Sequence, residues 1–259
     1  MLAALVWDVD GTLAETERDG HRVAFNRAFE SLGLAWRWDE AHYGALLHIT
    51  GGRERLLHDM AMRGDAPGLA EERARLAGEL HRHKNAHYAE IVQAGDIALR
   101  EGVVELIDEA AAAGLRQGIA TTTSRSNVQA LLQRQLGAGW RERFGAVVCG
   151  EDVSTKKPDP QVYRLALQAL GLPPMQALAL EDSPSGEQAA RLADVPVVVT
   201  RSAYFAHDTV EGALAIGPGL HSRKGWRPGL IDDLPDGPVT LNHLRDWHAR
   251  MERVSQHTG

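Results

Sequence analysis

Two carboxylates lie near the start of the chain, in the run Asp-Val-Asp-Gly-Thr at residues 8–12. In an extended segment, residues two apart point to the same side, so Asp8 and Asp10 can face one site. At about 5 Å, two such charges repel by roughly 3 kcal/mol at an effective dielectric of about 20. A proton on one of them, or a bound cation, must offset that repulsion. The alternative is an acidic loop that only ends a strand and caps the next element.

A run of hydroxyl side chains, Thr-Thr-Thr-Ser at 121–124, follows the apolar segment 115–120. Hydroxyls and backbone amides at the start of a helix form a phosphate-binding site. We therefore expect Thr121 and Thr122 to contact a phosphate. The same run also suits an N-cap for a helix at 125–136, and the two roles are compatible.

Two lysines and two acids follow later apolar segments. Lys156 and Lys157 precede a proline that restricts the backbone before a helix. We expect Lys157, rather than Lys156, to neutralise a phosphate; taken alone, the pair would be a solvated basic turn. Glu181 and Asp182 end an apolar segment, where acids are costly unless they meet a cation.

The four acids together predict a metal site. Asp8, Asp10, Glu181 and Asp182 carry up to four negative charges, and one lysine cannot balance them. All-oxygen ligands and a phosphoryl substrate favour Mg²⁺. The twelve histidines form no zinc signature, and the chain has one cysteine, so no cysteine pair exists.

Apolar periodicity predicts the elements that bring these groups together. Residues 2–7 suit a buried strand that ends at the first acid. We expect further strands at 115–121, 145–149, 177–181 and 197–199, and helices at 102–113, 125–136, 159–170 and 185–193. Helices that alternate with apolar strands imply right-handed crossovers and a parallel sheet, that is, an α/β Rossmann-like core. Ligands bind such a sheet at the carboxyl ends of its strands.

The segment 15–94 has a different character, because it is charged and patterned at helical spacing. We expect helices around residues 23–32 (with Gly33 as the cap) and at 39–48, 52–63 and 69–93. The simplest interpretation is an α-helical cap domain, residues 15–98, inserted into a core of residues 1–14 and 99–259. The hinge candidates are 14–16 and 94–100. We expect a loop at 217–235 and a closing helix that carries Leu241, Leu244, Trp247 and Met251.

Composition limits the class of protein. The 259 residues are 44% hydrophobic, enough for one large domain or two small ones. The net charge of −7 and the absence of a dense basic run argue against general binding of nucleic acid. Cys149 is expected in the core, and a single cysteine favours a reducing compartment. The first apolar run is too short for a signal peptide or a membrane span, so we expect a cytoplasmic monomer without a membrane partner.

The order of the chemical groups resembles the four motifs of the haloacid dehalogenase superfamily. The resemblance covers residues 1–200, with Asp-x-Asp-Gly-Thr, then Thr/Ser, Lys-Pro and Glu-Asp. The helical insertion resembles the small cap of subfamily I. The segments 14–17 (Ala-Glu-Thr-Glu), 21–26 (His-Arg-Val-Ala-Phe-Asn) and 50–54 (Thr-Gly-Gly-Arg-Glu) are similar to the CbbY-type phosphatases. Those are related to β-phosphoglucomutases, and some act on xylulose-1,5-bisphosphate.

This resemblance implies a role for each group in the core. Asp8 would be the nucleophile and a metal ligand, and Asp10 the general acid and base, with its carbonyl on Mg²⁺. The remaining assignments are Thr121 and Lys157 for the phosphoryl group, Asp182 for the metal, and Glu181 as ligand or neighbour. Asp10 must start protonated, so we expect burial and the nearby Asp8 to raise its pKa.

In the cap, the resemblance implies substrate contacts for Glu17, His21, Gly51, Gly52 and Arg53. Arg53 could bind a second, non-reacting phosphate, or it could be a surface residue of a helical turn. His21 could equally be a packed polar residue, and Tyr43 is a weaker candidate for contact.

The predicted function is that of a Mg²⁺-dependent sugar-phosphate phosphatase. It would act on a pentulose (bis)phosphate, such as xylulose-1,5-bisphosphate, through an aspartyl-phosphate intermediate. The alternatives are a sugar-phosphate mutase of the β-phosphoglucomutase type, a metal-independent haloacid dehalogenase, and a non-catalytic binding module on the same fold.

Overall fold

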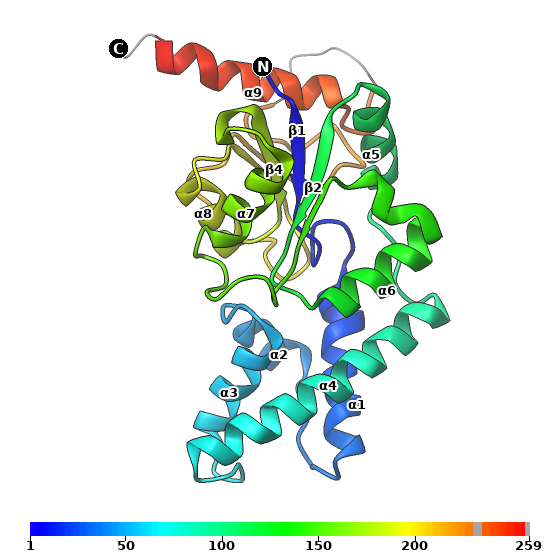
Figure 1. Ribbon diagram of the computed structural model, residues 1–259, viewed down its shortest axis with the longest axis vertical. Helices are drawn as coiled ribbons and strands as arrows, with labels where there is room; N and C mark the ends of the chain where they lie inside the picture. The colour runs from blue at the N-terminus through cyan, green and yellow to red at the C-terminus, as the bar shows by residue number, and fades with distance from the viewer. Residues whose placement is uncertain (230–234, 257–259) are drawn as a thin grey trace.

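The computed structural model describes residues 1–229 and 235–256, and within them six parallel strands form one sheet (Figure 1). The strands are β1 (Ala4–Trp7), β2 (Arg116–Ala120), β3 (Ala146–Val148), β4 (Ala177–Glu181), β5 (Val197–Thr200) and β6 (Ala215–Gly217). Their order is β3-β2-β1-β4-β5-β6. Because β1 pairs with β2 on one side and with β4 on the other, the carboxyl ends of these three strands are neighbours. The predicted parallel α/β sheet is confirmed, and β6 is an additional strand.

Helices cover both faces of the sheet. The helices α5 (Val103–Ala112), α6 (Arg125–Leu136) and α9 (Leu241–Gln256) pack on one face, and α7 (Gln161–Leu170) and α8 (Pro184–Leu192) pack on the other. Short 3₁₀ turns lie at Ala138–Arg143 and Pro174–Gln176. The expected closing helix is α9, and Trp247 on it lies 4.7 Å, ring to ring, from Trp226.

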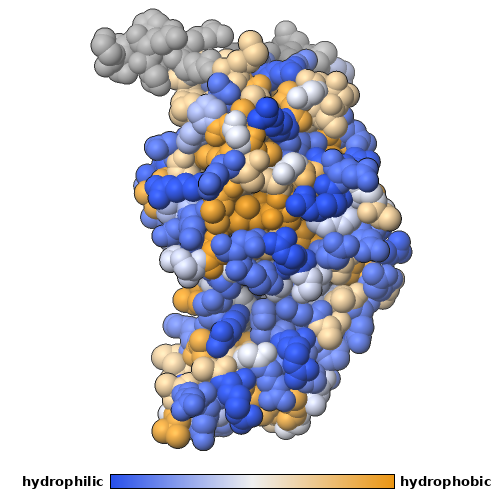
Figure 2. Space-filling model, viewed as in Figure 1, coloured by the Kyte–Doolittle hydropathy of each residue, from blue (hydrophilic) through white to orange (hydrophobic). Residues whose placement is uncertain are grey.

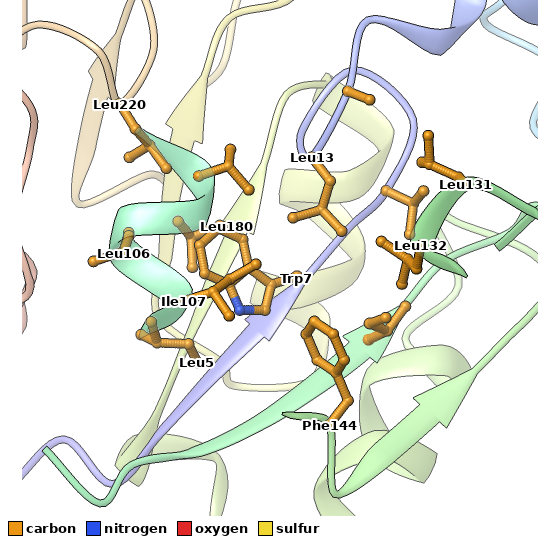
Figure 3. Packing of buried hydrophobic residues seen from close by; sticks show 14 of the residues in the cluster. Leu5, Trp7, Leu13, Leu106, Ile107, Leu131, Leu132, Phe144, Leu180 and Leu220 are labelled. Carbon is orange, nitrogen blue, oxygen red and sulfur yellow. The ribbon is translucent and has the colours of Figure 1, made fainter. Parts of the chain in front are cut away.

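Strand β1 is buried on both faces, so packing contacts on both sides fix its position in the sheet. Leu5 and Trp7 pack into the cluster under α5 and α6 (Figure 3), whereas Ala4 and Val6 pack toward α7 and α8. The Trp7 indole also donates a hydrogen bond to Gln117 on β2, at 3.1 Å. Because β1 is held in this way, the residues that follow it, from Asp8 onward, have a fixed position at the edge of the sheet.

Four further helices lie beyond the carboxyl ends of the strands, and we call them the cap helices (Figure 1). They are α1 (Arg22–Ser31), α2 (Glu40–Leu46), α3 (Gly52–Met62) and α4 (Ala70–Ala94), and a π-helical turn at Glu17–His21 precedes them. They have an apolar cluster of their own, built around Phe25, Phe29, Trp38 and Tyr43. The expected helices are therefore present, within a few residues of the expected bounds.

The chain passes between the sheet and the cap helices twice, and the two passages lie side by side. Ala14 pairs with Leu99 in an antiparallel bridge, and the backbone N–H of Arg100 donates to the carbonyl of Leu13 at 2.8 Å. The division into two domains at these segments stays a prediction. On the face shown in Figure 2, polar side chains cover most of the junction between the two parts. Among the described helices, none is long and apolar enough to cross a membrane.

Candidate active site at the strand ends

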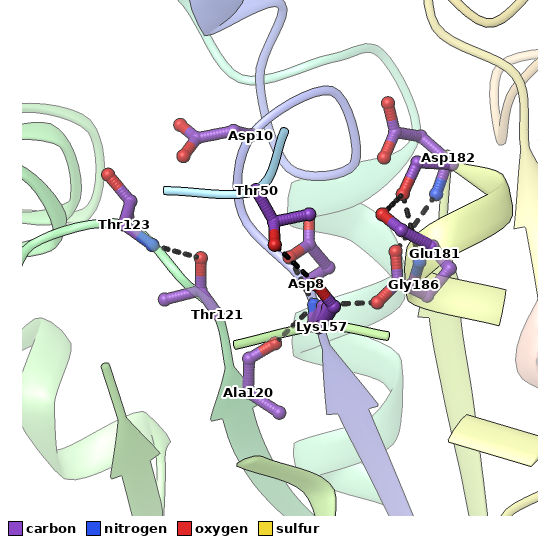
Figure 4. A network of polar contacts seen from close by, with 12 residues as sticks. Asp8, Asp10, Thr50, Ala120, Thr121, Thr123, Lys157, Glu181, Asp182 and Gly186 are labelled. Carbon is purple, nitrogen blue, oxygen red and sulfur yellow. Dashed lines mark hydrogen bonds and ion pairs between the residues drawn. The ribbon is translucent and has the colours of Figure 1, made fainter. Parts of the chain in front are cut away.

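A buried ion-pair network lies where β1, β2 and β4 end (Figure 4). Nζ of Lys157 lies 2.6 Å from Oδ1 of Asp8 and 2.7 Å from Oε1 of Glu181, and it also donates to the carbonyl of Ala120 at 2.8 Å. The three charged side chains are almost completely buried. Lys156 instead pairs with Glu54 on α3, at 2.9 Å. Of the two lysines, Lys157 is thus the one beside Asp8.

Three of the predicted metal ligands come together. Carboxylate oxygens of Asp8, Glu181 and Asp182 lie within 4.8 Å of one another, and all three residues are buried. Burial, opposed by Lys157, raises the pKa of Asp8 to about 8. Burial and the charge of Asp8 also raise the pKa of Asp182 well above its usual range. Three buried acids beside a single lysine are a donor set that a divalent cation fits.

The backbone around these acids leaves little space. Gly11 has φ +89°, and a Cβ on it would lie 2.0 Å from Oδ2 of Asp182. Glycine is therefore required for the turn that follows Asp10. Glu181 accepts hydrogen bonds from Lys157 and from the Tyr163 hydroxyl, so it faces the lysine as well as the other two acids.

The fourth predicted acid, Asp10, turns its side chain away from this trio. Its Oδ1 accepts a hydrogen bond from Thr16 at 2.6 Å and lies 2.9 Å from Nε2 of His21. Burial raises the pKa of Asp10, but the charge and hydrogen bond of His21, together with the Thr16 hydroxyl, bring that pKa well below its usual range. The expectation of a raised pKa was wrong, because it considered Asp8 and burial but not His21.

The predicted phosphate-binding run follows β2 as expected. Oγ1 of Thr121 accepts a hydrogen bond from the backbone N–H of Thr123 at 3.2 Å. Ser124 occupies the N-cap position of α6 without a capping hydrogen bond from its side chain. Its hydroxyl instead receives one from Asn85 of α4, at 3.1 Å. The side chain of Ser124 thus joins α6 to the cap helices and does not cap α6.

Two adjoining cavities separate the strand ends from the cap helices. The smaller, about 50 Å³, is lined by Asp8, Asp10, Thr121, Thr122, Lys157 and Asp182. The larger, about 280 Å³, is lined by all the predicted cap residues, namely Glu17, His21, Gly51, Gly52 and Arg53, together with Thr122. The structure therefore brings every predicted contact residue to one cleft.

Several cap residues in this cleft were not predicted. Arg55 is buried, and its Nη1 lies 2.9 Å from the Tyr43 hydroxyl and 3.8 Å from Oε2 of Glu17. Lys84 of α4 is also buried and lines the larger cavity, where burial lowers its pKa to about 8. Arg53, in contrast, is exposed at the rim. In the sequence, the one sign that Lys84 is buried is its position on α4, where the helical pattern otherwise has apolar residues.

Comparison with known proteins agrees with this geometry. A family model of haloacid dehalogenase-like hydrolases matches residues 2–194. Protein CbbY (plasmid) of Cupriavidus necator is 43% identical over 247 residues, which are 95% of this chain and 97% of that protein. A phosphoglycolate phosphatase of Rhodospirillum rubrum is 33% identical over 87% of this chain and 91% of its own length.

Solved structures are similar over most of the chain. The crystal structure of CbbY from Rhodobacter sphaeroides in complex with phosphate superposes with a TM-score of 0.77 at 43% identity, covering 82% of this chain and 92% of that one. A mutant of the same protein in complex with xylulose-(1,5)-bisphosphate gives a TM-score of 0.77 at 42% identity and the same coverage. The predicted fold and enzyme class are confirmed: the chain belongs to the haloacid dehalogenase-like hydrolases and is similar to the CbbY proteins.

Proposed function

We propose that this hydrolase is a Mg²⁺-dependent sugar-phosphate phosphatase whose substrate is a pentulose bisphosphate such as xylulose-1,5-bisphosphate. The observation that carries the proposal is the position of Asp8. Its carboxylate lies against Lys157 at the base of a cleft that two cationic residues of the cap helices, Arg53 and Lys84, also line. Such a cleft has room for a sugar that carries one phosphate at Asp8 and another near the cap helices.

In this proposal, Asp8 attacks phosphorus in line, the bond from phosphorus to the sugar oxygen breaks, and the resulting aspartyl phosphate is then hydrolysed by water. Lys157 neutralises the equatorial oxygens, and Thr121 and Thr122 orient them. Asp8, Asp182 and the backbone carbonyl of Asp10 would hold Mg²⁺, with Glu181 as a further ligand or as the group that positions Lys157. When bound there, the ion would supply positive charge where phosphoryl charge accumulates.

The hydrogen bond between Asp10 and His21 supplies the proton chemistry. The leaving oxygen needs a proton in the first half of the reaction, and water must lose one in the second. Because the pKa of Asp10 is lowered, Asp10 is ionised near neutral pH, the form that accepts a proton from water. In the first half, Nε2 of His21, 2.9 Å from Oδ1 of Asp10, would pass its proton to that carboxylate as Asp10 protonates the leaving oxygen; in the second half, Asp10 would take a proton from water and pass it back to His21.

The cap helices would select the substrate. We infer a core of residues 1–14 and 99–259 and a cap of residues 15–98, which move about the paired segments near Ala14 and Leu99. Glu17, held by Tyr43 and Arg55, would accept hydrogen bonds from sugar hydroxyls, and the backbone at Gly51 and Gly52 would contact the same ligand. The similarity to a CbbY protein that was solved with xylulose-(1,5)-bisphosphate supports this substrate class.

A phosphate-release screen tests the proposal. The purified protein is incubated with sugar mono- and bisphosphates, xylulose-1,5-bisphosphate included, with either Mg²⁺ or EDTA. We expect release that depends on Mg²⁺ and is fastest with a pentulose bisphosphate. Conversion of a hexose 1-phosphate to its 6-isomer would identify a mutase, activity that survives EDTA would identify a metal-independent enzyme, and no turnover at all would favour a binding module.

A further inference from the structure

A segment of the core that follows β5 reaches into the cap helices, and we call residues 201–208 the strap. Phe205 belongs to the apolar cluster of the cap helices and is 9% exposed. Its ring lies 6.2 Å from the ring of His48, which follows α2. Tyr204 packs on the same cluster, with its ring 5.9 Å from that of Tyr43 in an edge-on arrangement. Two neighbouring aromatic side chains of the core are thus seated in the cap.

The ring of Tyr204 fits against a glycine of α2. Gly44 lies in the middle of α2, and a Cβ on it would meet Cδ1 of Tyr204 at 3.1 Å and Cε1 at 3.2 Å. The ring therefore packs directly on the backbone of α2, and a side chain at position 44 would require the ring to move by a few tenths of an ångström. Within the described residues, the Tyr204 hydroxyl is buried without a hydrogen-bond partner, so the ring, not the hydroxyl, makes the contact.

The strap is hydrogen-bonded within itself and to the two segments that connect the core with the cap helices. Nη1 of Arg201 donates to the carbonyls of Phe205 and Asp208, at 2.9 Å each. Nη2 of Arg100, in one linker, donates to the carbonyl of Arg201 at 2.7 Å. The backbone N–H of Ala203 donates to Oε2 of Glu15, in the other linker, at 3.4 Å. A movement of the cap about these connecting segments would therefore reach the strap at Arg201 and Ala203.

The strap also touches the candidate metal site. Ser202 is buried beside Asp182: a Cβ added to Gly11 would lie 3.1 Å from Cβ of Ser202 and 2.0 Å from Oδ2 of Asp182, and Ser202 opposes the rise in the pKa of Asp182. Phe205, three residues later, lines the smaller cavity together with Asp8 and Asp182. The strap thus connects the aromatic contacts with the cap helices to Asp182, which is expected to bind the metal.

We propose that the strap is a latch that holds the cap closed over the cleft and couples closure to the position of Asp182. Tyr204 and Phe205 occupy their seats in the closed form described here and leave them when the cap opens. Ser202 is a positioning residue, since it acts on the substrate only through Asp182. The inference takes from the proposed function only the expectation that the cap moves.

Hydrogen–deuterium exchange of the full chain tests the latch without relying on catalysis. The test variant is Tyr204→Ala, and the matched control is Tyr204→Phe, which keeps the ring and removes the unpartnered hydroxyl. We expect faster exchange in Tyr204→Ala at segments facing the cleft, 50–54 and 153–157, and exchange like that of the wild type in the control. Faster exchange confined to the strap itself, or equal effects in both variants, would overturn the proposal.

Kinetics provide the second readout. With the preferred sugar phosphate, we expect Tyr204→Ala to raise KM by roughly tenfold, because an aromatic contact that holds the closed form is lost. With p-nitrophenyl phosphate, which does not reach the cap, KM should change by less than about twofold. Equal changes with both substrates would contradict the latch. If no sugar phosphate is turned over, the proposed function fails, while the exchange experiment still decides on the latch.

Ser202→Ala tests whether the strap positions Asp182, separately from its role in holding the cap closed. We expect it to raise the Mg²⁺ concentration needed for half-maximal activity by about 10-fold, the lower end for loss of a residue that orients a metal ligand. Exchange at 50–54 should match that of the wild type. An unchanged Mg²⁺ requirement in Ser202→Ala would show that the strap does not position Asp182.

Discussion

His21 lies with its Nε2 2.9 Å from Oδ1 of Asp10, and the two residues come from different parts of the chain, the start of the cap and the end of β1. The His21 ring also stacks on Tyr88 of α4, with 4.2 Å between ring centroids. The acid–base group of the proposed reaction therefore depends on a cap residue that α4 holds in place. Opening of the cap would separate the pair and allow the pKa of Asp10 to rise.

Replacement of His21 by glutamine keeps a hydrogen-bond donor and removes the charge. The pKa of Asp10 then rises toward its ordinary value, since the charge of His21 is the largest contribution that lowers it. Because Asp10 must be ionised to activate water, we expect the acid limb of the kcat profile to move to higher pH. We also expect kcat to fall by roughly 10²-fold. An unchanged pH profile would show that His21 is only a packed residue.

The nucleophile is tested by Asp8→Asn. This substitution keeps the size of the side chain but replaces the nucleophilic carboxylate by a neutral amide, so turnover should be abolished while the circular dichroism spectrum is retained. Asp159→Asn, a substitution of an acid outside both cavities, serves as the control and should keep full activity. Wild-type rates in Asp8→Asn would contradict the assignment.

Metal binding should be visible in the pH dependence of stability. The folded-state pKa of Asp8 is raised from 3.8 to about 8, so the folded chain holds a proton there that the unfolded chain releases. Without metal, the free energy of unfolding should fall as pH rises from about 4 to 8. Mg²⁺ displaces that proton, so its stabilisation should be larger at pH 8 than at pH 5.

Thermal unfolding in EDTA and in Mg²⁺, at both pH values, measures this difference. Ca²⁺ is a useful comparison, because the same oxygen ligands accept it with less strict geometry. Equal Mg²⁺-induced shifts of the midpoint at pH 5 and pH 8 would argue against a metal site that includes Asp8.

The meeting of the strand-end groups could be predicted from the sequence, because the carboxyl ends of neighbouring parallel strands lie at one edge of the sheet. Asp8, Lys157, Glu181 and Asp182 meet for this reason. The π-helical turn at Glu17–His21 and the packing of the cap helices could not be predicted in this way. Whether a charged residue on an amphipathic helix is buried or exposed, as for Lys84, depends on which helices pack against it, and periodicity does not supply that information.

Two other features of the structure were not predicted, again because they depend on contacts between elements. Strand β6 has three residues, Ala215–Gly217, which is too short a run for alternation to be recognised, and only its pairing with β5 identifies it. Arg55 is buried and Arg53 exposed because α3 begins at Gly52 and turns the second arginine toward Glu17 and Tyr43. Two arginines separated by one residue in a helix face different directions, and the sequence does not say which one faces inward.

Lys84 connects burial to substrate affinity. Its pKa is lowered to about 8, chiefly by burial, so the free enzyme loses this positive charge as pH rises through that value. We expect KM for a sugar phosphate to rise above about pH 8, and Lys84→Met to raise KM at pH 7 and remove this dependence. Steady-state kinetics from pH 6.5 to pH 9 would measure both, and a pH dependence retained in Lys84→Met would assign it to another group.

The same substitution should stabilise the protein. A lysine whose folded-state pKa is lowered is less easily charged in the folded chain than in the unfolded chain, so at neutral pH its burial opposes folding. Wild-type stability should therefore increase as pH rises from about 8 to 10.5, while Lys84→Met should be more stable at pH 7 and should lack this increase. Chemical denaturation at the two pH values checks the sign, and a less stable Lys84→Met would mean that the contacts of the ammonium with Phe25 and Tyr88 outweigh its burial.

The last prediction concerns the second phosphate. Arg53 lines the larger cavity and not the smaller one that contains Asp8, so it is placed to contact a group that does not react. Arg53→Ala should raise KM for a pentulose bisphosphate by roughly 10-fold, as expected for loss of one charge-assisted contact. KM for an aryl phosphate should remain close to the wild-type value, because that substrate has no distal phosphate. Arg37→Ala, an exposed arginine of the same cap outside both cavities, is the control and should affect neither substrate. Equal increases with both substrates in Arg53→Ala would place Arg53 near the reacting phosphoryl group or in the fold of α3, and another cation of the cavity, such as Lys84, would then bind the distal phosphate.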